Sequence, residues 1–486
     1  MKQESEVIIY FPNTGDANYT PPYEAMFQKK ALESIGLQSI IIDGRFESLD
    51  KHITPNNKNI TLIISTIIKY TSITIINQYN DGLKIAKEYF EKYSLKSIWT
   101  GQAALLLKDQ LLDLESTESV IDNIDEKVLL NFLSEKFSIN TNSLEYDCNF
   151  DIDCIDLKPY IHNKTLDYIS STGCINSCTF CSVPSIYKQK WKQIDKNTIL
   201  KHFQYLKSNY PEIEFIHFRD DNFAVNKKKI FSLLNLLKSE KLNYKWSAQT
   251  SVNILKTYSN DELLRLNQYG CNNISIGIES GDPWLLEKIT KNKTTVQDSL
   301  DSIQRLLKSG IEPSVTSIVG FPFNNKRDIK LTLKLLMKIK LIYPSLSLYS
   351  TFFLPIPTTQ AFEEIYGKGN NDIGFGTSNK WLTRQDKELL HKFESTYFLF
   401  CDKNFHKRFN PSKRLKLTNK TLYPFIRLRF RSSSTSFLWE HKIASILLGK
   451  SFETDSKNME YGIRKHNTNY DFGLSKSDNN SLVKKH

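Results

Sequence analysis

The 486-residue sequence lacks several features that would place it in other classes of protein. It has no run of about eighteen apolar residues, so we expect no transmembrane segment. The first residues, MKQESEVIIYFP, are polar and then strand-like, without the basic and apolar regions of an export signal. We therefore expect a cytoplasmic location.

Cysteine is scarce and unevenly placed. The chain has seven cysteines, an odd number, and none of them lies in residues 1–147. A long chain with an odd number of cysteines and no export signal is not typical of a disulfide framework. The sequence therefore indicates a reducing compartment.

The excess of basic residues, a formal net charge of +12, does not by itself favour a nucleic-acid partner. Lysine and arginine are spread along the chain, as expected for a general surface charge. One cluster stands apart, FIRLRFR at 425–431, with Arg427, Arg429 and Arg431. Its alternation is typical of an edge strand with the arginines on one solvated face.

Residues 1–140 alternate short β-branched runs with amphipathic stretches. This alternation predicts a doubly wound, Rossmann-like α/β domain with a parallel sheet. Ligands of such sheets bind at the carboxyl ends of the strands. The loops of interest are therefore 12–22, 43–46, 65–67 and 100–103.

A polar, acidic and Asn-rich connector at 141–164 precedes a second series of strands and helices. Six strand and helix pairs in residues 165–368 predict a partial (βα)6 barrel of the TIM type. Functional residues of such barrels lie at the carboxyl ends of the strands. Residues 369–486 predict a mainly helical C-terminal region with a disordered tail.

The first strand of the barrel series leads into STGCINSCTFCSVP, which holds Cys174, Cys178 and Cys181. A closed structural zinc site needs four ligands, and the chain has no second Cys-x-x-Cys and no His-x-x-His pair. A cubane iron-sulfur cluster is held by cysteine thiolates, and three of them leave one iron open. The triplet therefore favours a cluster whose open iron takes a substrate or cofactor.

The spacing Cys174-x3-Cys178-x2-Cys181, with aromatic Phe180 before the third cysteine, resembles the signature of the radical S-adenosylmethionine (SAM) superfamily. The resemblance implies that the three cysteines bind a [4Fe-4S] cluster and that SAM chelates its open iron. It also implies reductive cleavage of SAM to methionine and a 5′-deoxyadenosyl radical. A flavodoxin or ferredoxin-type protein would then supply the electron.

Further segments resemble the subgroup of this superfamily that carries an N-terminal cobalamin-binding domain. In the barrel they are FRDDNF (218–223), WSAQTS (246–251), SIGIESGDPWLLEKITK (275–291), TSIVGFPFNN (316–325) and FFLPIPTTQAFEEI (352–365). In the first domain, YTPPYEAMFQKKALESIGLQSIIIDGR (19–45) is similar to the start of the cobalamin-binding domain. The likeness extends from residue 7 to about residue 365.

The resemblance also assigns residues to the cofactors. Asp220 and Asp221 stand where many relatives carry a Gly-Gly-Glu segment that meets the SAM amino group. Glu279 and Gln249 would contact the ribose or methionine part of SAM, and the segment 318–320 would pass the adenine. The cofactor-binding residues implied in this way are Phe180, Asp220, Asp221, Gln249, Glu279, Ser280, Ile318, Gly320, Ser65 and Gly101.

Taken singly, these residues also have plainer interpretations. Asp220 and Asp221 could cap a helix, Gly320 could belong to an ordinary turn, and Glu279 could be a solvated charge. Their joint order after the cysteine triplet is what favours a SAM site.

The first domain departs from one pattern of cobalamin proteins. Domains that supply a histidine to the cobalt carry Asp-x-His-x-x-Gly, and DGRFES (43–48) has no histidine. Where many relatives show Gly-Gly after the fourth strand, this chain has Thr100-Gly101-Gln102. The resemblance thus implies base-off cobalamin without a histidine ligand. The absence of cysteine from residues 1–147 excludes the tRNA methylthiotransferases, which need three further cysteines there.

The favoured function is a cobalamin-dependent radical SAM methyltransferase that acts on an unactivated carbon of a small-molecule or natural-product substrate. The sequence names no catalytic acid or base. One alternative is a radical SAM rearrangement, cyclisation or coupling reaction without methyl transfer. An alternative of another class is a zinc-stabilised RNA-binding protein whose basic cluster at 425–431 grips phosphates.

Overall fold

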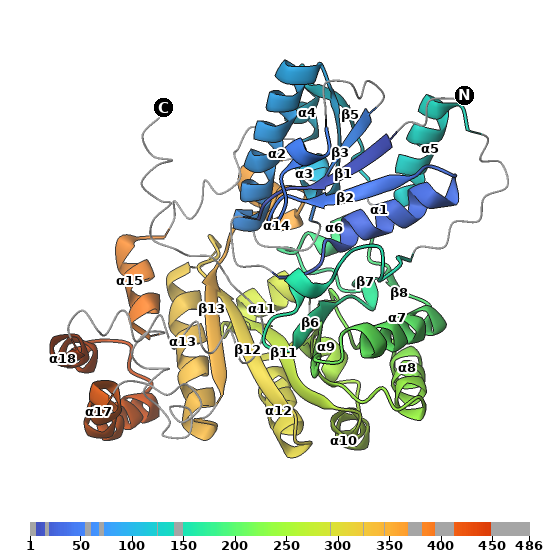
Figure 1. Ribbon diagram of the computed structural model, residues 1–486. Coiled ribbons are helices and arrows are strands. Elements are labelled where there is room, and N and C mark those ends of the chain that lie inside the picture. The colour runs from blue at the N-terminus through green and yellow to red at the C-terminus, as the bar shows by residue number, and fades with distance from the viewer. Residues whose placement is uncertain are drawn as a thin grey trace. The chain divides into compact units, whose positions relative to one another are not determined.

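The computed structural model describes residues 6–14, 19–53, 60–67, 72–123, 125–139, 149–291, 293–323, 325–344, 346–367, 382–393 and 413–448. They form two compact units that divide between Ile155 and Asp156. This division falls within the predicted connector, and the limits assigned to each domain stay a prediction. Each unit has its own parallel sheet and its own helices (Figure 1).

The first unit is a doubly wound α/β fold with a five-stranded parallel sheet in the order β2-β1-β3-β4-β5. Its strands are β1 (Glu6–Phe11), β2 (Ser39–Asp43), β3 (Ile60–Thr66), β4 (Ser97–Thr100) and β5 (Thr117–Val120). Its helices are α1 (Tyr23–Ser34), α2 (Ser72–Tyr93), α3 (Gly101–Leu106), α4 (Lys108–Leu112) and α5 (Glu126–Phe137), with a 3-10 turn at Leu49–Lys51. The predicted fold class of this region is confirmed.

Successive side chains of the central strands enter two separate apolar cores, as the period of two along a strand requires. Ile8 and Leu62 pack in one core with residues of α2, α3 and α4. Val7 and Ile63 pack in the other core with residues of α1 and α5. Because both faces of the sheet are covered, its exposed chemistry is confined to the strand ends.

The ends of β3 and β4 meet at a glycine. Gly101 has a φ of +79°. A Cβ at this position would overlap with the backbone carbonyl of Thr66. The hydroxyl of Thr66 holds the contact, since it donates to the carbonyl of Thr100 at 2.8 Å and accepts from the amide of Ala103 at 3.0 Å. The end of β4 can therefore pack this closely on the end of β3 only with a glycine at position 101.

We expect Gly101→Ala to destabilise the first unit by at least ~2 kcal/mol, because it adds a steric overlap to the cost of a left-handed backbone. Hydrogen exchange of peptides from β3 and β4 in the full chain measures the effect. Gly36→Ala is the matched control, since Gly36 has the same φ of +79° and nothing within 4 Å of its Cβ position. Equal loss of protection in the two variants would contradict the contact.

The second unit contains a six-stranded parallel sheet in the order β13-β12-β11-β10-β9-β6. Its strands are β6 (Thr165–Tyr168), β9 (Phe215–Phe218), β10 (Lys245–Ser251), β11 (Cys271–Glu279), β12 (Glu312–Val319) and β13 (Ser347–Phe352). In the described chain β6 and β13 are the edges, so this sheet forms an open, partial barrel. The predicted (βα)6 series is confirmed.

Helices follow the strands and cover the outer face of the sheet (Figure 1). Those of the barrel are α6 (Val183–Ile186), α7 (Lys196–Asn209), α8 (Lys227–Ser239), α9 (Val252–Leu255), α10 (Asn260–Gln268), α11 (Pro283–Thr290), α12 (Val296–Lys308), α13 (Asn325–Ile342) and α14 (Gln360–Tyr366), with a 3-10 turn at Lys158–Tyr160. Helices α15 (Arg384–Lys392), α17 (Lys413–Ser432) and α18 (Trp439–Leu448) follow. No helix in the described ranges combines the length and apolar composition needed to cross a membrane.

The first predicted barrel strand, LDYISS, is broken in the structure. Strand β6 ends at Tyr168, and Ser171–Gly173 form a separate strand, β7, which pairs antiparallel with β8 (Trp191–Gln193). The three cysteines lie in the loop between β7 and β8. Ser170, which lies between the two strands, contacts Asp220 through its amide and its hydroxyl, and this contact interrupts the strand.

The prediction of an edge strand at 425–431 is wrong, since these residues belong to α17. Leu422, Ile426 and Phe430 are buried and recur every four residues, which is the period of a helix. The arginines do not share one solvated face. Arg429 is buried and paired with Glu440 of α18, whereas Arg427 and Arg431 are exposed.

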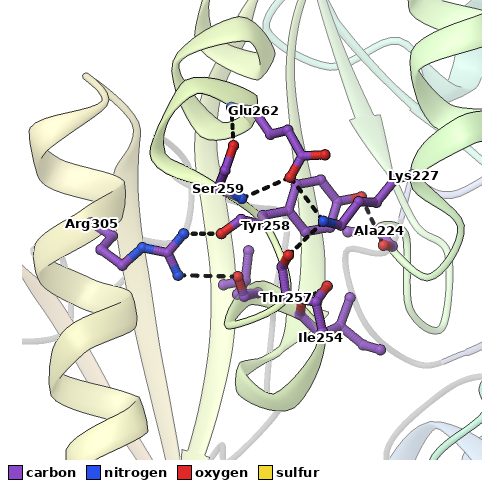
Figure 2. A network of polar contacts seen from close by, with 9 residues as sticks. Ala224, Lys227, Ile254, Thr257, Tyr258, Ser259, Glu262 and Arg305 are labelled. Atoms are coloured by element: carbon purple, nitrogen blue, oxygen red, sulfur yellow. Dashed lines mark hydrogen bonds and ion pairs between the residues drawn. The ribbon is translucent and has the colours of Figure 1, made fainter.

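A polar network on the outer side of the barrel fixes the loop that follows β9 (Figure 2). The hydroxyl of Tyr258 donates to the carbonyl of Ala224 at 2.8 Å. Lys227 at the start of α8 pairs with Glu262 of α10 at 2.8 Å, and Glu262 closes a capping box with Ser259. Arg305 of α12 donates to the carbonyl of Tyr258. These contacts attach the loop after β9, at Ala224 and Lys227, to the helices on the outer side of the barrel.

Candidate active site

The cysteine loop carries three reduced thiols. Cys174 is buried and Cys178 and Cys181 are partly buried, and all three are free of disulfides. Burial raises the pKa of each thiol, to about 12 for Cys178, and neighbouring thiols add to the effect for Cys178 and Cys181. These raised pKa values favour neutral thiols in the protein alone. A bound metal centre is what would turn them into thiolate ligands.

Asp220, at the end of β9, fixes the start of the loop. Its carboxylate is fully buried and accepts hydrogen bonds from the amide of Ser170 at 2.8 Å and the hydroxyl of Ser170 at 2.7 Å. The hydroxyl of Ser171 donates to the same carboxylate. Asp221 accepts from the amide of Gly173 at 2.6 Å. The paired aspartates therefore hold three of the four residues that precede Cys174, namely Ser170, Ser171 and Gly173.

A second set of contacts reaches the sulfur of Cys174 itself. The side-chain amide of Asn222 donates to this sulfur at 3.3 Å, and the backbone amide of Asn176 donates to it at 3.5 Å. Thr250 orients Asn222 by donating to its carbonyl oxygen at 2.6 Å. Ser251 accepts from both asparagines at 3.0 Å. Donors to a cysteine sulfur stabilise its thiolate form.

The other end of the loop is held by backbone bonds and an apolar cluster. The amide of Thr179 donates to the carbonyl of Ile289 in α11 at 2.9 Å, and its carbonyl accepts from Ala361 in α14 at 2.8 Å. Phe180 packs edge-on against Phe321, with ring centroids 5.9 Å apart. Ile318 joins the same apolar cluster. Phe180 thus anchors the loop between Cys178 and Cys181.

Glu279 ends β11 in an unusual setting. Its φ is +57°, at a register shift between β11 and β12. Its carboxylate lies against Gly277, where a Cβ would overlap with it. Burial raises the pKa of Glu279 from 4.5 to about 7, and no hydrogen-bond donor or basic side chain of the described residues contacts its carboxylate. The negative charge of Glu279 also raises the pKa of the Cys178 thiol in the cysteine loop.

Ser280 and Gly320 are tied together by Asp328 of α13. Asp328 accepts from the hydroxyl of Ser280 at 2.6 Å and from the amide of Gly320 at 2.8 Å. Burial raises the pKa of Asp328 to about 6. Gly320 has a φ of +81°, which favours glycine. These contacts fix the carboxyl ends of β11 and β12 side by side.

Gln249 lies in β10, two residues before the strand ends at Ser251. Its side-chain amide donates to the carbonyl of Asp220 at 3.1 Å, and its own carbonyl accepts from the amide of Phe223 at 3.0 Å. Gln249 is partly exposed, and its two hydrogen bonds attach β10 to the segment 220–223.

In the first unit, the predicted residues Ser65 and Gly101 lie at the carboxyl ends of β3 and β4. The hydroxyl of Ser65 is fully buried and has no hydrogen-bond partner in the described structure. The same holds for the carbonyl oxygen of Gln102 and the hydroxyl of Thr14. Gly101 instead contacts the backbone of Thr66, as described above. Unpaired buried polar atoms at one sheet edge fit a polar ligand.

The sequence reasoning missed four residues of the barrel site: Asn176, Asn222, Ser251 and Asn253. Asn253 exchanges hydrogen bonds with Asn176 at 2.8 and 3.2 Å. Asn222 could have been found from the sequence, because it directly follows the Asp pair in FRDDNF (218–223). The link from the loop to Ser251 spans 75 residues and leaves no trace in local spacing.

Single-ion binding has no support in the described ranges, where no three His, Cys, Asp or Glu side chains come together closely enough to hold one metal ion. The zinc alternative therefore gains nothing from the geometry. A cubane cluster has four iron atoms and separates its cysteine ligands more widely than one ion does. The donor set of three thiols on one anchored loop fits such a cluster.

Comparison with known families gives a match within the second unit. Residues 168–336 match the family model described as the Radical SAM superfamily. The chain therefore carries a radical SAM domain, as the cysteine spacing predicted, and this domain contains all three cysteines and the ends of β9 to β12.

Curated relatives are similar over about half of their length. An uncharacterized methyltransferase of Pyrococcus horikoshii is 29% identical over 227 residues, which are 47% of each chain. The bacteriochlorophyllide d C-12(1)-methyltransferase of Chlorobaculum tepidum is 26% identical over 221 residues, 45% of this chain and 46% of that one. The chain thus spans about half the length of the curated relatives it matches.

Two solved structures share the fold over more of the chain. The cobalamin-dependent SAM radical enzyme OxsB, with aqua-cobalamin and SAM bound, aligns with a TM-score of 0.61 at 13% identity, covering 95% of this chain and 79% of that one. The radical SAM methyltransferase TsrM from Kitasatospora setae, with cobalamin and a [4Fe-4S] cluster bound, aligns with a TM-score of 0.58 at 13% identity, covering 75% of each chain. At such identities the likeness shows the fold.

Glu279 makes the free energy of unfolding of the chain depend on pH. Because burial raises the pKa of Glu279 from 4.5 to about 7, its contribution to the stability of the folded chain is greatest below pH 4.5, where this group is protonated, and it is lost as the pH rises from 4.5 through 7. We expect Glu279→Gln to stabilise the chain by about 3 kcal/mol at pH 8 and by about 1 kcal/mol at pH 5. Urea unfolding at both pH values measures this. The control is Glu287→Gln on α11, and a Glu279→Gln gain that is larger at pH 5 would contradict the assignment.

Proposed function

We propose that the protein binds a [4Fe-4S] cluster, SAM and cobalamin, and that it transfers a methyl group to an unactivated carbon of a small-molecule or natural-product substrate. The observation that carries this proposal is the anchored loop of three thiols, because three protein ligands would leave one iron of a cubane cluster open for SAM. When bound, the cluster supplies the electron that cleaves SAM to a 5′-deoxyadenosyl radical. A flavodoxin or ferredoxin-type protein is the expected reductant.

The chain's own residues divide the work of the barrel site. Cys174, Cys178 and Cys181 hold the cluster, and Asn222 and the amide of Asn176 donate to the first of these sulfurs. Such hydrogen bonds raise the reduction potential of a cluster by stabilising the more negative state.

Glu279 is the SAM contact best supported by the geometry. A buried carboxylate without a donor or cation is costly until a ligand provides one, and SAM offers a cationic amino group and ribose hydroxyls. Gln249 is partly exposed nearby, and Ile318 offers an apolar surface at the end of β12 for the adenine. Asp220, by contrast, spends its carboxylate on Ser170 and Ser171, so we assign it to positioning the loop.

The first unit is proposed to hold cobalamin at the carboxyl edge of its sheet. The unpaired oxygens of Thr14, Ser65 and Gln102 support this, since the amides and phosphate of cobalamin provide hydrogen-bond partners. The names of the relatives, which include methyltransferases, support methyl transfer. Here the protein supplies binding and exclusion of water, while the cofactors carry the chemistry.

Anaerobic reconstitution with iron and sulfide tests the proposal. We expect a brown protein that, once reduced, converts SAM to 5′-deoxyadenosine, and we expect Cys→Ala changes at 174, 178 or 181 to abolish both properties. Cys271→Ala, at a buried cysteine of β11, is the matched control and should keep both. A reconstituted protein that binds zinc and cleaves no SAM would overturn the radical assignment.

The two enzyme alternatives separate in the same assay. Corrinoid that co-purifies, seen in the visible spectrum, supports the cobalamin site. S-adenosylhomocysteine formed together with 5′-deoxyadenosine supports methyl transfer. Deoxyadenosine without S-adenosylhomocysteine, in the presence of a converted substrate, would favour rearrangement, cyclisation or coupling instead.

The hydrogen bond from Asn222 to Cys174 provides a sharper test of the cluster site. We expect Asn222→Ala to lower the cluster's reduction potential by roughly 20 to 60 mV, the equivalent of one lost hydrogen bond. A redox titration followed by electron paramagnetic resonance measures the shift. Asn176→Ala is the control, because it perturbs the same network but keeps the backbone donor to Cys174. An equal shift in both variants would assign the effect to the network and not to the sulfur contact.

A further inference from the structure

Helices α17 and α18 form a C-terminal helical hairpin that contributes no residue to the candidate active site. Between residues 413 and 448 it holds eight lysines and arginines and a single acidic residue, Glu440. Glu440 is buried and paired with Arg429. In this described hairpin, the surface that faces solvent therefore carries basic side chains and no acidic one.

Apolar side chains share that surface. Leu417 and Leu428 of α17 are 67% and 64% exposed. They are eleven residues apart, so they lie on one stripe of the helix, three turns from each other. On α18, Ile443, Ile446 and Leu447 recur at the spacing of one helix face and are all exposed.

The basic side chains lie along the same exposed side of α17. Lys420, Arg427 and Arg431 are exposed and are seven and four residues apart, which places them on one stripe. This stripe adjoins that of Leu417 and Leu428. The opposite stripe, with Leu422, Ile426 and Phe430, is buried, and α17 packs there against α13 and α18. Helix α17 thus has one buried apolar face and an opposite exposed face, on which leucines lie beside basic side chains.

The turn between the two helices presents an aromatic ring to solvent. Phe437 is 86% exposed, although its backbone is fixed. Arg429 donates to the carbonyl of Ser436 at 2.7 Å and to the carbonyl of Phe437 at 2.8 Å while it pairs with Glu440. A buried arginine that clamps the turn keeps the ring outside the core.

We propose that this hairpin docks on the surface of an anionic phospholipid bilayer. Exposed leucine, isoleucine and phenylalanine side chains beside a basic stripe match the apolar interface and the negative headgroups of such a surface. An acidic protein would also complement the cations, but the exposed apolar side chains Leu428, Phe437 and Ile446 on separate elements of the hairpin fit insertion among lipids. The hairpin lies on the membrane and does not span it.

Sedimentation of the full chain with vesicles tests the proposal. The probes are vesicles of phosphatidylcholine alone and of phosphatidylcholine with phosphatidylglycerol. We expect binding to the anionic vesicles that weakens with added salt and little binding to the neutral ones. Each basic residue near such a surface contributes about fivefold, so Lys420→Glu, Arg427→Glu and Arg431→Glu together should lower the partition coefficient about 100-fold or more.

Two further variants separate charge from apolar insertion. The control combines Lys201→Glu, Lys228→Glu and Lys308→Glu, which are exposed on α7, α8 and α12 and change the net charge equally. It should bind nearly as the parent chain does. Phe437→Ser with Ile446→Ser should weaken binding even at low salt, and because both side chains are exposed, the fold should persist.

Three outcomes would overturn the proposal. The first is equal sedimentation with neutral and anionic vesicles. The second is equal loss of binding in the control and in the hairpin charge variant. The third is a parent chain that is dimeric by light scattering and that becomes monomeric in Phe437→Ser with Ile446→Ser, because a second copy would then cover the surface.

Discussion

The geometry of the site depends on one buried carboxylate. Asp220 lies two residues after β9, the second strand of the barrel, and accepts three hydrogen bonds from the two serines that precede the cysteine loop. A buried carboxylate without those donors would be costly, so strand end and loop are stable only together. The resulting turn breaks the first strand after Tyr168 and directs β7 away from the sheet. The three cysteines therefore leave the barrel at a fixed place.

The rest of the loop is held from different elements. Asn222 reaches the sulfur of Cys174, and its carbonyl accepts a hydrogen bond at 3.0 Å from the indole of Trp191 on the returning strand β8. Phe180 and Thr179 attach the far end to α11, α14 and the apolar cluster around Phe321. An anchored loop orders its thiols before any cofactor arrives, which reduces the entropy that binding must supply.

Much of the architecture could be predicted from the sequence because strand and helix periods are local. Both sheets and the order of the barrel units followed from them. The edge strand predicted at 425–431 is wrong because FIRLRFR fits the period of a strand as well as that of a helix. Only the burial of Leu422, Ile426 and Phe430 in the folded chain shows that the segment is helical. In the site, the cysteines could be predicted from spacing, whereas the contacts of Asn176 with Ser251 and Asn253 join distant strand ends and could not.

Hydrogen-bond satisfaction separates two kinds of residue that the family likeness groups together. Asp220, Ser280 and Gly320 have their polar groups committed to the protein, and so they hold the strand ends in place. Ser65 and Gln102 in the first unit keep buried oxygens without a protein donor, and the partly buried carboxylate of Glu279 in the barrel has a pKa raised by burial alone. A buried oxygen without a donor costs free energy, and a ligand that donates a hydrogen bond to it removes that cost. Ligand contact is therefore best sought at the unsatisfied positions, and loop positioning at the satisfied ones.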